Sequence, residues 1–170
     1  MSSKDGPGAS PGPSSEAARK RLRQQATRDT APEMALRREL HRRGLRYRVH
    51  VRLLQEVRRT SDIVFRRAGV AVDVRGCWWH GCDDHRPAPR ANRDWWFQKR
   101  ERNRSRDDDT LRRLEAEGWR VLVVWEHEEI SSAADRVELA VRGCVIKRQA
   151  AENSANFGRA LRGSRRYRDV

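Results

Sequence analysis

The sequence predicts a mixed α/β domain in which a small sheet is flanked by helices, in the order α-β-β-β-α-β-α. Segments with apolar residues at helical spacing alternate along the chain with short segments whose apolar residues are continuous or have period two. Glycines mark the ends of several of these segments. Both ends of the chain have little apolar material for a core, which confines the domain to about residues 30–146.

The first predicted helix begins at the stretch "TAPE", residues 30–33. This stretch has the capping-box pattern, and it carries proline in the first helical turn. The helix ends at Gly44 and supplies four apolar residues: Met34, Ala35, Leu36 and Leu40. The stretch "YRVHV", residues 47–51, alternates with period two and predicts a half-buried strand.

Two short strands and a loop follow in the sequence. The stretches "DIVF" (62–65) and "VAVDV" (70–74) predict strands that are joined by a tight turn through "RRAG". The loop "GCWWHGCDDH" (76–85) then holds two of the three cysteines, two of the five histidines and two of the six tryptophans. This density of possible metal ligands and aromatic rings makes the loop the first candidate for a site.

The second half of the domain contains a long helix, a strand and a final helix. Residues 93–117 predict the long helix, which Gly118 ends. The stretch "WRVLVVWE" (119–126) is the most apolar strand, so we expect it at the centre of the sheet. We expect the final helix to begin near Ser131 or Ser132 and to run to about residue 148.

The segments outside the domain are polar and basic. Residues 1–16 are rich in Gly, Pro and Ser and predict a disordered tail. Residues 17–29 predict a basic arm that becomes ordered on a partner, and residues 147–170 predict a second basic tail. The net charge of +14 favours a polyanionic partner, because each phosphate contact releases counterions. A soluble basic protein without such a partner, or one bound to a membrane surface, is the alternative.

No segment predicts secretion or a membrane span. The longest apolar run is "VLVVW" (121–125), far short of the roughly 20 residues that cross a bilayer. The N-terminus lacks the hydrophobic segment of a secretion signal. Three cysteines are too few and too unevenly spaced for a disulfide framework. We therefore expect a cytoplasmic protein whose thiols stay reduced or bind metal.

The long helix has polar residues on the side that should face the core. At 100° per residue, Trp96, Leu111 and Leu114 define an inward stripe. Three polar residues lie on the same stripe: Lys99, Asn103 and Asp107. Buried polar groups cost free energy unless they have partners. Either the helix projects past the core and this stripe is solvated, or the three residues face a polar cleft.

Acidic residues interrupt the two short strands. Asp62 opens the first, and in the second Asp73 and Arg75 share a face with Ala71, so that face is not a purely apolar core. An acid on one strand beside an acid-x-base triplet on the next is the arrangement of a metal-dependent nuclease, in which two carboxylates hold Mg²⁺. The pattern is short, and a chain with 36% charged residues also produces it by chance.

The loop of residues 76–85 has the spacing of metal ligands. Four side chains form the pattern C-x₂-H-x-C-x₂-H: Cys77, His80, Cys82 and His85. This clustering favours zinc, which prefers four tetrahedral nitrogen and sulfur ligands. The alternatives without metal are an exposed loop with incidental histidines and an inert buried cysteine. If zinc binds, one possibility is that these four residues are its complete set of ligands. The other is that His127 or Cys144 is the fourth ligand, which leaves one histidine of the loop for general acid–base catalysis.

The tandem tryptophans Trp78 and Trp79 are not both expected in the core if their neighbours bind a small ion. Tandem aromatic rings on a basic surface are suited to insertion between base pairs, where apolar wedges unstack and kink a duplex. Alternatively, one of the two covers the metal site and packs on the core.

Together these residues resemble the very-short-patch repair (Vsr-type) DNA mismatch endonucleases. The resemblance runs from about Thr27 to His127 and rests on the order and spacing of "ATRDTAPEMALRRELHRRGLRYRVH", "SDIVF", "GCWWHGC..H", "NRDWWFQKRERNRSRD" and "GWRVLVVWEHE". It implies a fold related to the type II restriction endonucleases, with a structural zinc. It also implies an enzyme that nicks one strand beside the T of a T:G mismatch, the product of 5-methylcytosine deamination.

The resemblance implies a set of catalytic residues. Asp62 matches the aspartate that binds catalytic Mg²⁺, and His80 matches the catalytic histidine. Glu33 and Asp107 match acidic residues that assist the site. Glu33 is also the acid of the capping box, so two roles compete for its carboxylate.

The resemblance also implies zinc and DNA contacts. The zinc ligands would be Cys77, Cys82, His85 and His127. His80 is then free, and Cys144 is left over. Three residues match aromatic rings that wedge into the duplex: Trp78, Trp79 and Trp96. The basic segment 19–28, which ends in Arg28, matches an arm that clasps DNA, and Lys99 is expected to position the DNA backbone.

Two segments depart from the family's pattern. The family has "PGxPD" before the metal-binding aspartate, where this chain has "VRRTSD" (57–62). The strand before the first loop cysteine is like "VFVDGC" in the family and is "VDVRGC" (72–77) here. We hypothesise that Asp73 restores the second acid of the ordinary restriction-nuclease site, with Arg75 in the place of its lysine.

The expected partner is double-stranded DNA with a T:G mismatch, bound by a monomeric, nucleoid-associated enzyme, with mismatch-repair proteins as further partners. A restriction- or defence-type nuclease on the same scaffold is one alternative, since mismatch preference depends on pocket shape and DNA deformation. A non-catalytic zinc-dependent DNA-binding module, which needs the zinc ligands but not Asp62, is the other.

Overall fold

The computed structural model describes residues 15–16, 19–20, 23, 26–82, 84–85 and 91–164, with the backbone alone at 147–148 and 150–164. The strands are β1 (Arg48–Val51), β2 (Ser61–Phe65), β3 (Val70–Arg75) and β4 (Arg120–Trp125). The helices are α2 (Ala31–Arg42), α3 (Cys77–His80), α4 (Arg93–Ala116) and α5 (Ile130–Ser164). The predicted class, α/β with a small mixed sheet flanked by helices, is confirmed.

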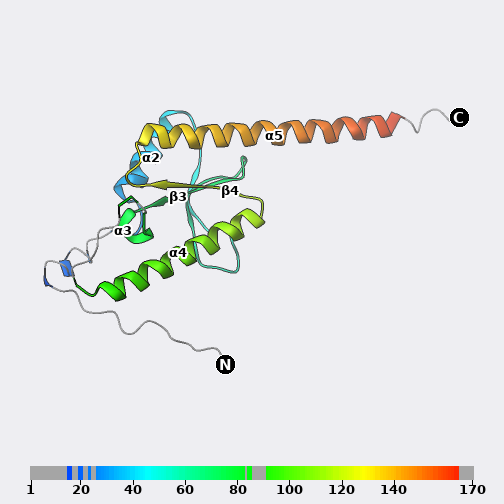
Figure 1. Ribbon diagram of the computed structural model, residues 1–170. Helices are drawn as coiled ribbons and strands as arrows, with labels where there is room; N and C mark the ends of the chain where they lie inside the picture. The colour runs from blue at the N-terminus through cyan, green and yellow to red at the C-terminus, as the bar shows by residue number, and fades with distance from the viewer. Residues whose placement is uncertain are drawn as a thin grey trace, which may run out of the picture.

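The four strands form one sheet in the order β1-β2-β3-β4. The pairs β1–β2 and β2–β3 are antiparallel, and β3–β4 is parallel. A parallel pair needs a long crossover connection, and α4 supplies it. Figure 1 shows α4 on one face of the sheet and α5, with α2 beside it, on the other.

β4 lies at the edge of the sheet, so the expectation of a central position is wrong. Its apolar composition has a different cause, because helices cover both of its faces. Val124 is buried in the core on the α5 side, and α4 packs against the strand from the other side. A strand that is covered on both faces is apolar throughout, wherever it lies in the sheet. Arg136 of α5 donates to the carbonyl of Val123 at 3.2 Å and covers part of the free edge.

The hydrophobic core lies between the sheet and the pair α2–α5. Its fully buried residues come from α2, β2, β3 and α5: Leu36, Leu40, Ile63, Val70, Val72, Ala133, Ala134 and Val137. Side chains alternate across a strand, so the neighbours of these strand residues face α4. On that face Val64 and Ala71 are buried, and Asp62 and Asp73 follow them at one end of the sheet. The two aspartates therefore lie outside the apolar core.

Three local features differ from the sequence-based expectation. The loop of residues 76–85 contains the single-turn helix α3, which Gly81 ends with a φ of +64°. The capping box is only half formed: the Thr30 side chain does not cap the helix, whereas Glu33 accepts from the Asp29 N–H at 3.0 Å. The last helix begins at Ile130 and continues to Ser164, so residues 147–164, expected as a tail, are helical.

Some expectations concern residues outside the described part. Residues 1–14 of the expected disordered tail, six residues of the expected arm (17–18, 21–22 and 24–25) and residues 165–170 are not among the described ones. Within the described ranges, none of the helices combines the length and apolar character that crossing a bilayer requires.

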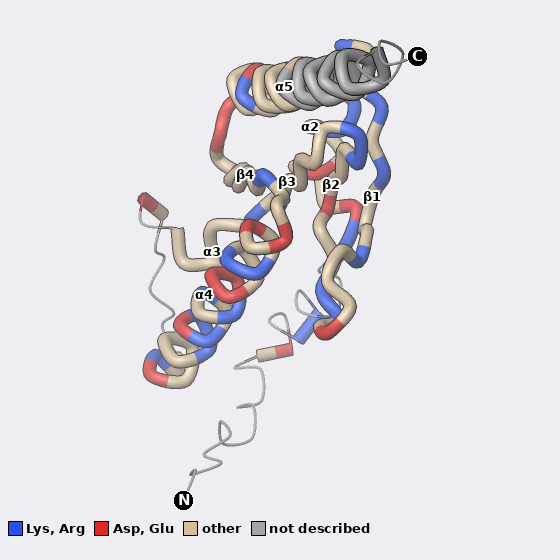
Figure 2. Tube along the Cα trace, turned by 90° about the vertical axis from the view of Figure 1, so that its right-hand side faces the viewer, with Lys and Arg blue, Asp and Glu red and all other residues tan. Residues whose placement is uncertain are grey.

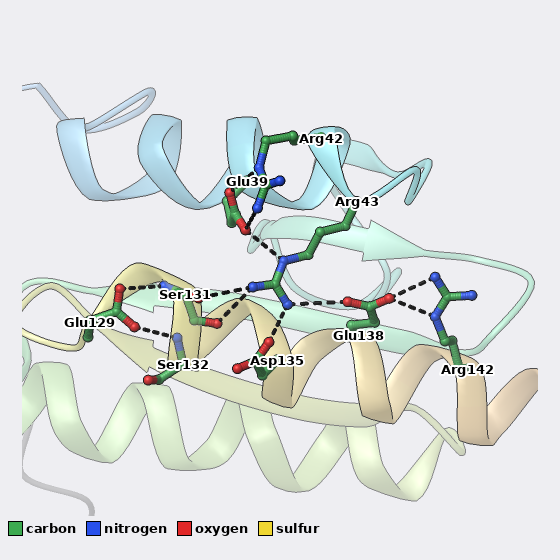
Figure 3. A network of polar contacts seen from close by, with 9 residues as sticks. All are labelled: Glu39, Arg42, Arg43, Glu129, Ser131, Ser132, Asp135, Glu138 and Arg142. Carbon is green, nitrogen blue, oxygen red and sulfur yellow. Dashed lines mark hydrogen bonds and ion pairs between the residues drawn. The ribbon is translucent and has the colours of Figure 1, made fainter.

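Arg43 joins the end of α2 to the start of α5 (Figure 3). Its guanidinium donates to Glu39 at 2.7 Å, to Glu138 at 3.2 Å and to Asp135. It also donates to the carbonyl and hydroxyl of Ser131, each at 3.2 Å. The Arg43 side chain is only 13% exposed, so this network is partly shielded from water. Hydrogen bonds from Arg42 and then Arg43 lower the pKa of Glu39 to about 2, so the network stays charged in mildly acidic solution.

We predict that Arg43→Met lowers the free energy of unfolding clearly more than Arg42→Met does, because several partly shielded acceptors lose their donor. Urea unfolding measures this. Arg42→Met is the matched control: that side chain is 73% exposed and has Glu39 as its one acidic partner among the described residues, so a much smaller loss is expected. Equal losses in the two variants would contradict the joining role of Arg43.

Candidate active site and metal-ligand cluster

A cleft of about 630 Å³ opens where β2 begins and β3 ends. One wall is formed by α3 and α4, and the other by the start of α2 together with β1. The five residues predicted to be catalytic all line it: Glu33, Asp62, Asp73, His80 and Asp107. Three further residues that the sequence singled out also line it: Arg75, Trp79 and Asn103. The polar stripe of α4 thus faces a cleft, except that Lys99 is half-buried elsewhere on the helix and does not line it.

Asp62 and Asp73 stand side by side on the floor of the cleft. The register pairs Ile63 with Val72, so one step further along the strands Asp62 lies across from Asp73. Cross-strand neighbours have their Cβ atoms about 4.5–5.5 Å apart. The Oδ2 of Asp62 accepts the N–H of Val74 at 2.7 Å. The Oδ1 of Asp73 is buried and has no hydrogen-bond partner among the described residues.

Burial raises the pKa of both aspartates. The Asp62 pKa is raised by burial, against the N–H of Val74, which lowers it. The Asp73 pKa is raised to about 6, first by burial and then by the negative charge of Asp62; Arg75 and the Ser61 hydroxyl lower it. Two adjacent carboxylates, one with an unpartnered buried oxygen, are stabilised by a cation between them.

His50 extends this row by one strand. The register pairs Val49 with Ile63 and Val51 with Ser61, so His50 stands across from Asp62. Its φ of +49° is in the left-handed region, which is uncommon for a residue other than glycine. The sequence analysis missed His50, because a period-two strand gives no reason to single out its one histidine. Its position beside Asp62 follows only from the register.

His80 and Asp107 form a pair on the opposite wall. The Nδ1 of His80 lies 2.5 Å from the Oδ2 of Asp107, and the side chains are 25% and 13% exposed. A carboxylate at Nδ1 fixes the ring and leaves Nε2 as the nitrogen for proton transfer. Asn103 donates to the carbonyl of Trp79 at 3.0 Å and so fixes α3 to α4.

Glu33 is engaged in structural bonds at the start of α2. Its carboxylate accepts from the Thr30 hydroxyl at 3.1 Å and from Nη2 of the buried Arg37 at 3.0 Å, besides the Asp29 N–H. Asp29, Glu33 and His50 are close enough to hold a metal ion. However, the Arg37 guanidinium contacts all three, so a cation already takes that position. In this arrangement the Glu33 carboxylate accepts hydrogen bonds at the start of α2 and pairs with Arg37.

Four ligand-type side chains gather beside α3: Cys77, Cys82, His85 and His127. Their ligand atoms all lie within 4.8 Å of one another. The Nδ1 of His127 is 3.0 Å from the Cys77 sulfur and 3.7 Å from the Cys82 sulfur. The sequence spacing left open whether His80, His127 or Cys144 joins this cluster. In the structure His127 lies in it, whereas His80 contacts Asp107 and Cys144 packs against the core.

The electrostatics of the cluster fit a cation. Burial, and then the neighbouring Cys82 thiol and the Glu126 carboxylate, together raise the pKa of the Cys77 thiol to about 12. Such thiols ionise when a metal ion replaces the proton. Two sulfur and two nitrogen donors form the set that zinc prefers.

Glu126 holds the start of α3 against the end of β4. Its Oε1 accepts the N–H of Cys77 at 2.6 Å, directly after the last register pair, Arg75 with Trp125. This bond brings the cysteine loop to His127, the residue after Glu126. The sequence analysis did not single out Glu126, because the need for an acceptor at Cys77 appears only once α3 is known.

The tryptophans form one group centred on Trp96. Its ring centroid lies 5.7 Å from Trp78, 5.8 Å from Trp79 and 4.8 Å from Trp95, all edge to face. All four are partly exposed. The ring that stacks on a residue of the metal-ligand cluster is Trp125, which lies 6.4 Å from His127. Trp78, Trp79 and Trp96 are thus held together beside the cleft and remain accessible.

Arginines surround the cleft. Arg28, the end of the basic arm, lines it, and so do Arg58, Arg59 and Arg106. Arg58 and Arg59 belong to the segment "VRRTSD" that departs from the family's pattern. The sequence analysis noted this departure but assigned no role to the two arginines.

The chain was compared with known proteins. Residues 14–86 match the family model described as DNA mismatch endonuclease Vsr. The chain is 46% identical over 110 residues to the type II nicking enzyme V.NaeI of Lentzea aerocolonigenes, which covers 64% of this chain and 66% of that protein. It is 40% identical over 109 residues to the type II nicking enzyme V.XorIIP of Xanthomonas oryzae pv. oryzae (63% and 77% covered). It is 35% identical over 108 residues to the DNA mismatch endonuclease Vsr of Escherichia coli (63% and 67% covered). The chain therefore belongs to the Vsr family of DNA endonucleases.

Proposed function

We propose that this protein nicks one strand of duplex DNA beside the T of a T:G mismatch, by Mg²⁺-dependent hydrolysis of a phosphodiester bond. The observation that carries the chemistry is the pair Asp62 and Asp73 on the floor of an arginine-lined cleft, facing the pair His80 and Asp107. The mismatch preference is inferred from the family model and from the Escherichia coli relative, both of which are named for it.

The donor set on the floor fits Mg²⁺, which binds carboxylate oxygens and keeps several of its waters. The buried Oδ1 of Asp73 lacks a partner among the described residues, and burial raises the pKa of both aspartates, so a cation between them would stabilise their charged forms. Asp62 and Asp73 would hold the ion. When bound, it supplies neutralisation of the phosphate and stabilisation of charge on the leaving oxygen.

The remaining residues of the cleft handle the proton and the phosphate. His80 takes the proton of the attacking water at Nε2, while Asp107 holds Nδ1 and stabilises the charged imidazolium. Arg75 is 9% exposed and stands two residues after Asp73, on the same face of β3. Its guanidinium is suited to orient a phosphate oxygen, in the place that a lysine has in the ordinary restriction-nuclease site.

We further propose that Cys77, Cys82, His85 and His127 bind a structural zinc. Four protein ligands close the tetrahedral shell, as is typical of structural rather than catalytic sites. The Asp84 carboxylate lies 3.8 Å from the Nε2 of His127 and is placed as the outer partner that zinc-bound histidines usually have. Such a site would keep His80 and the tandem tryptophans in a fixed position relative to β4.

A restriction- or defence-type nicking enzyme is the second candidate. The relatives V.NaeI and V.XorIIP, at 46% and 40% identity, are named type II nicking enzymes, and both are more similar to this chain than the Escherichia coli mismatch endonuclease at 35%. An enzyme of this kind would nick without needing a mismatch.

Nicking of labelled duplexes tests the proposed function. We expect Mg²⁺-dependent nicking of a duplex with a central T:G pair and none of the matched C:G duplex, and we expect Asp62→Asn to reduce nicking below detection because it removes a metal ligand. Asp94→Asn, which neutralises an exposed acid of α4 outside the cleft, is the matched control. Equal nicking of both duplexes would establish the second candidate instead. Tight binding without nicking would leave only a DNA-binding module.

Asp73→Asn separates the functional from the structural role of Asp73. The folded-state pKa of about 6 is above the ordinary 3.8, so the ionised carboxylate destabilises the protein without Mg²⁺, increasingly as the pH rises from about 4 to about 6. We therefore expect Asp73→Asn to raise Tm by roughly 3–10 °C at pH 8, and by less at pH 4.5. The same variant should lose Mg²⁺-dependent nicking. Unchanged nicking would contradict the role of Asp73 as second acid.

Zinc analysis of the purified protein tests the metal-ligand cluster. We expect about one zinc per chain, and we expect Cys82→Ser to lose the metal and several degrees of Tm. Cys144→Ser is the matched control, because Cys144 packs against the core away from the cluster and should leave the zinc content unchanged. His80→Gln should keep the zinc and lose nicking. Loss of zinc in that variant would mean that His80 is a ligand.

A further inference from the structure

The loop between β1 and β2, residues 52–60, has a shape that is fixed by arginine side chains. Arg52 donates from Nε to the carbonyls of Leu54 at 3.1 Å and Val57 at 3.0 Å, and its guanidinium also contacts the carbonyl of Gln55. Leu54 is 5% exposed and anchors the loop to the body of the protein. The loop is therefore held in one conformation, although it lacks the Pro and Gly of the family's pattern.

Arg59 connects this loop to α4. Its Nη1 lies 3.0 Å from the carbonyl of Arg106, 2.7 Å from Oδ2 of Asp109 and 2.7 Å from the hydroxyl of Thr110. The side chains of Arg59 and Asp109 are about one-third exposed, at 30% and 31%. Three acceptors from one helix fix the direction of the guanidinium, so the loop is attached to the far wall of the cleft.

Arg58, the residue before this attachment, lines the cleft and is exposed. In the described ranges no acidic side chain or other acceptor pairs with it. The neighbouring cations differ: Arg59 pairs with Asp109, Arg106 lies 3.8 Å from Asp107, and Arg75 stands beside Asp73. Figure 2 shows the basic residues of this loop in blue below β1. A guanidinium on a fixed backbone without an anion, above a cleft that cuts DNA, is a site for a phosphate.

We propose that residues 52–60 form a phosphate-binding loop, in which Arg58 contacts a DNA backbone phosphate flanking the cleaved one and Arg59 is the positioning residue. The inference rests on the proposed function of the cleft and adds a contact to it. Phosphate contacts set the register of a protein on DNA and carry no base sequence, so Arg58 contributes to affinity and placement rather than to mismatch choice.

DNA binding measured over a range of salt concentrations tests the contact. We expect Arg58→Ala to weaken binding on the order of tenfold, equally for matched and mismatched duplexes, and to reduce the slope of log K against log salt by about one. Arg58→Lys should restore most of the slope. Arg120→Ala is the matched control, because this exposed arginine pairs with Val70 at the opposite end of β4 from the cleft.

A series of duplexes, each with one neutral methylphosphonate at a different position around the nick, identifies the phosphate that Arg58 contacts. The wild type should lose affinity at one flanking position more than at the others, and Arg58→Ala should show no further loss there. Arg59→Ala should spread this preference over several positions, and Arg59→Lys should restore it.

The outcomes separate the two proposals. If Arg58→Ala has the same salt slope and the same methylphosphonate profile as the wild type, the proposal of a phosphate-binding loop is wrong, even if nicking is normal. A wild type that binds duplex DNA without nicking it would overturn the proposed function, while the binding measurements still decide the role of Arg58.

Discussion

The parallel pairing of β3 with β4 is the interaction on which both candidate sites depend. The two strands end side by side, at Arg75 and Trp125. Glu126 can therefore accept the N–H of Cys77, and His127 can reach the Cys77 sulfur. The same pairing requires a crossover, and the crossover helix α4 carries polar side chains over the floor of the cleft. A shift of β4 by one residue would turn each of its side chains to the opposite face and separate the cluster from its fourth member.

The cleft is organised by charge, with acids on its floor and arginines at its rim. Asp73 lies on the same face of β3 as Ala71, which is fully buried. An apolar residue at position 73 would therefore cost less free energy of folding than an aspartate does. Keeping in this place a carboxylate whose Oδ1 has no partner among the described residues costs stability, which is typical of sites retained for chemistry. By charge, the rim is suited to phosphate and the floor to a cation, so the proposed substrate and the proposed metal would bind at different depths of one cleft.

Much of the fold and part of the site could be predicted from the sequence, because periodicity reports which faces of an element are covered. It located all four strands and the three longer helices, and it placed Asn103 and Asp107 towards a cleft. Periodicity does not report which strands are neighbours, so the edge position of β4 was missed. His50 was missed for the same reason, since its place beside Asp62 depends on strand register. The choice among His85, His127 and other ligands depended on distances between segments far apart in the chain.

The side chain of Arg59, shortly before Asp62, holds the two halves of the cleft together. Proline and glycine fix a loop through its backbone dihedral angles alone. Here Arg59 fixes the loop through its side chain, and its acceptors belong to α4. Arg59 precedes Asp62 by three residues, and its partner Asp109 follows Asp107 by two. The contact therefore joins the strand that carries Asp62 to the helix turn that carries the partner of His80. A side chain that fixes a loop thus also fixes the separation of the two groups on which the proposed hydrolysis depends.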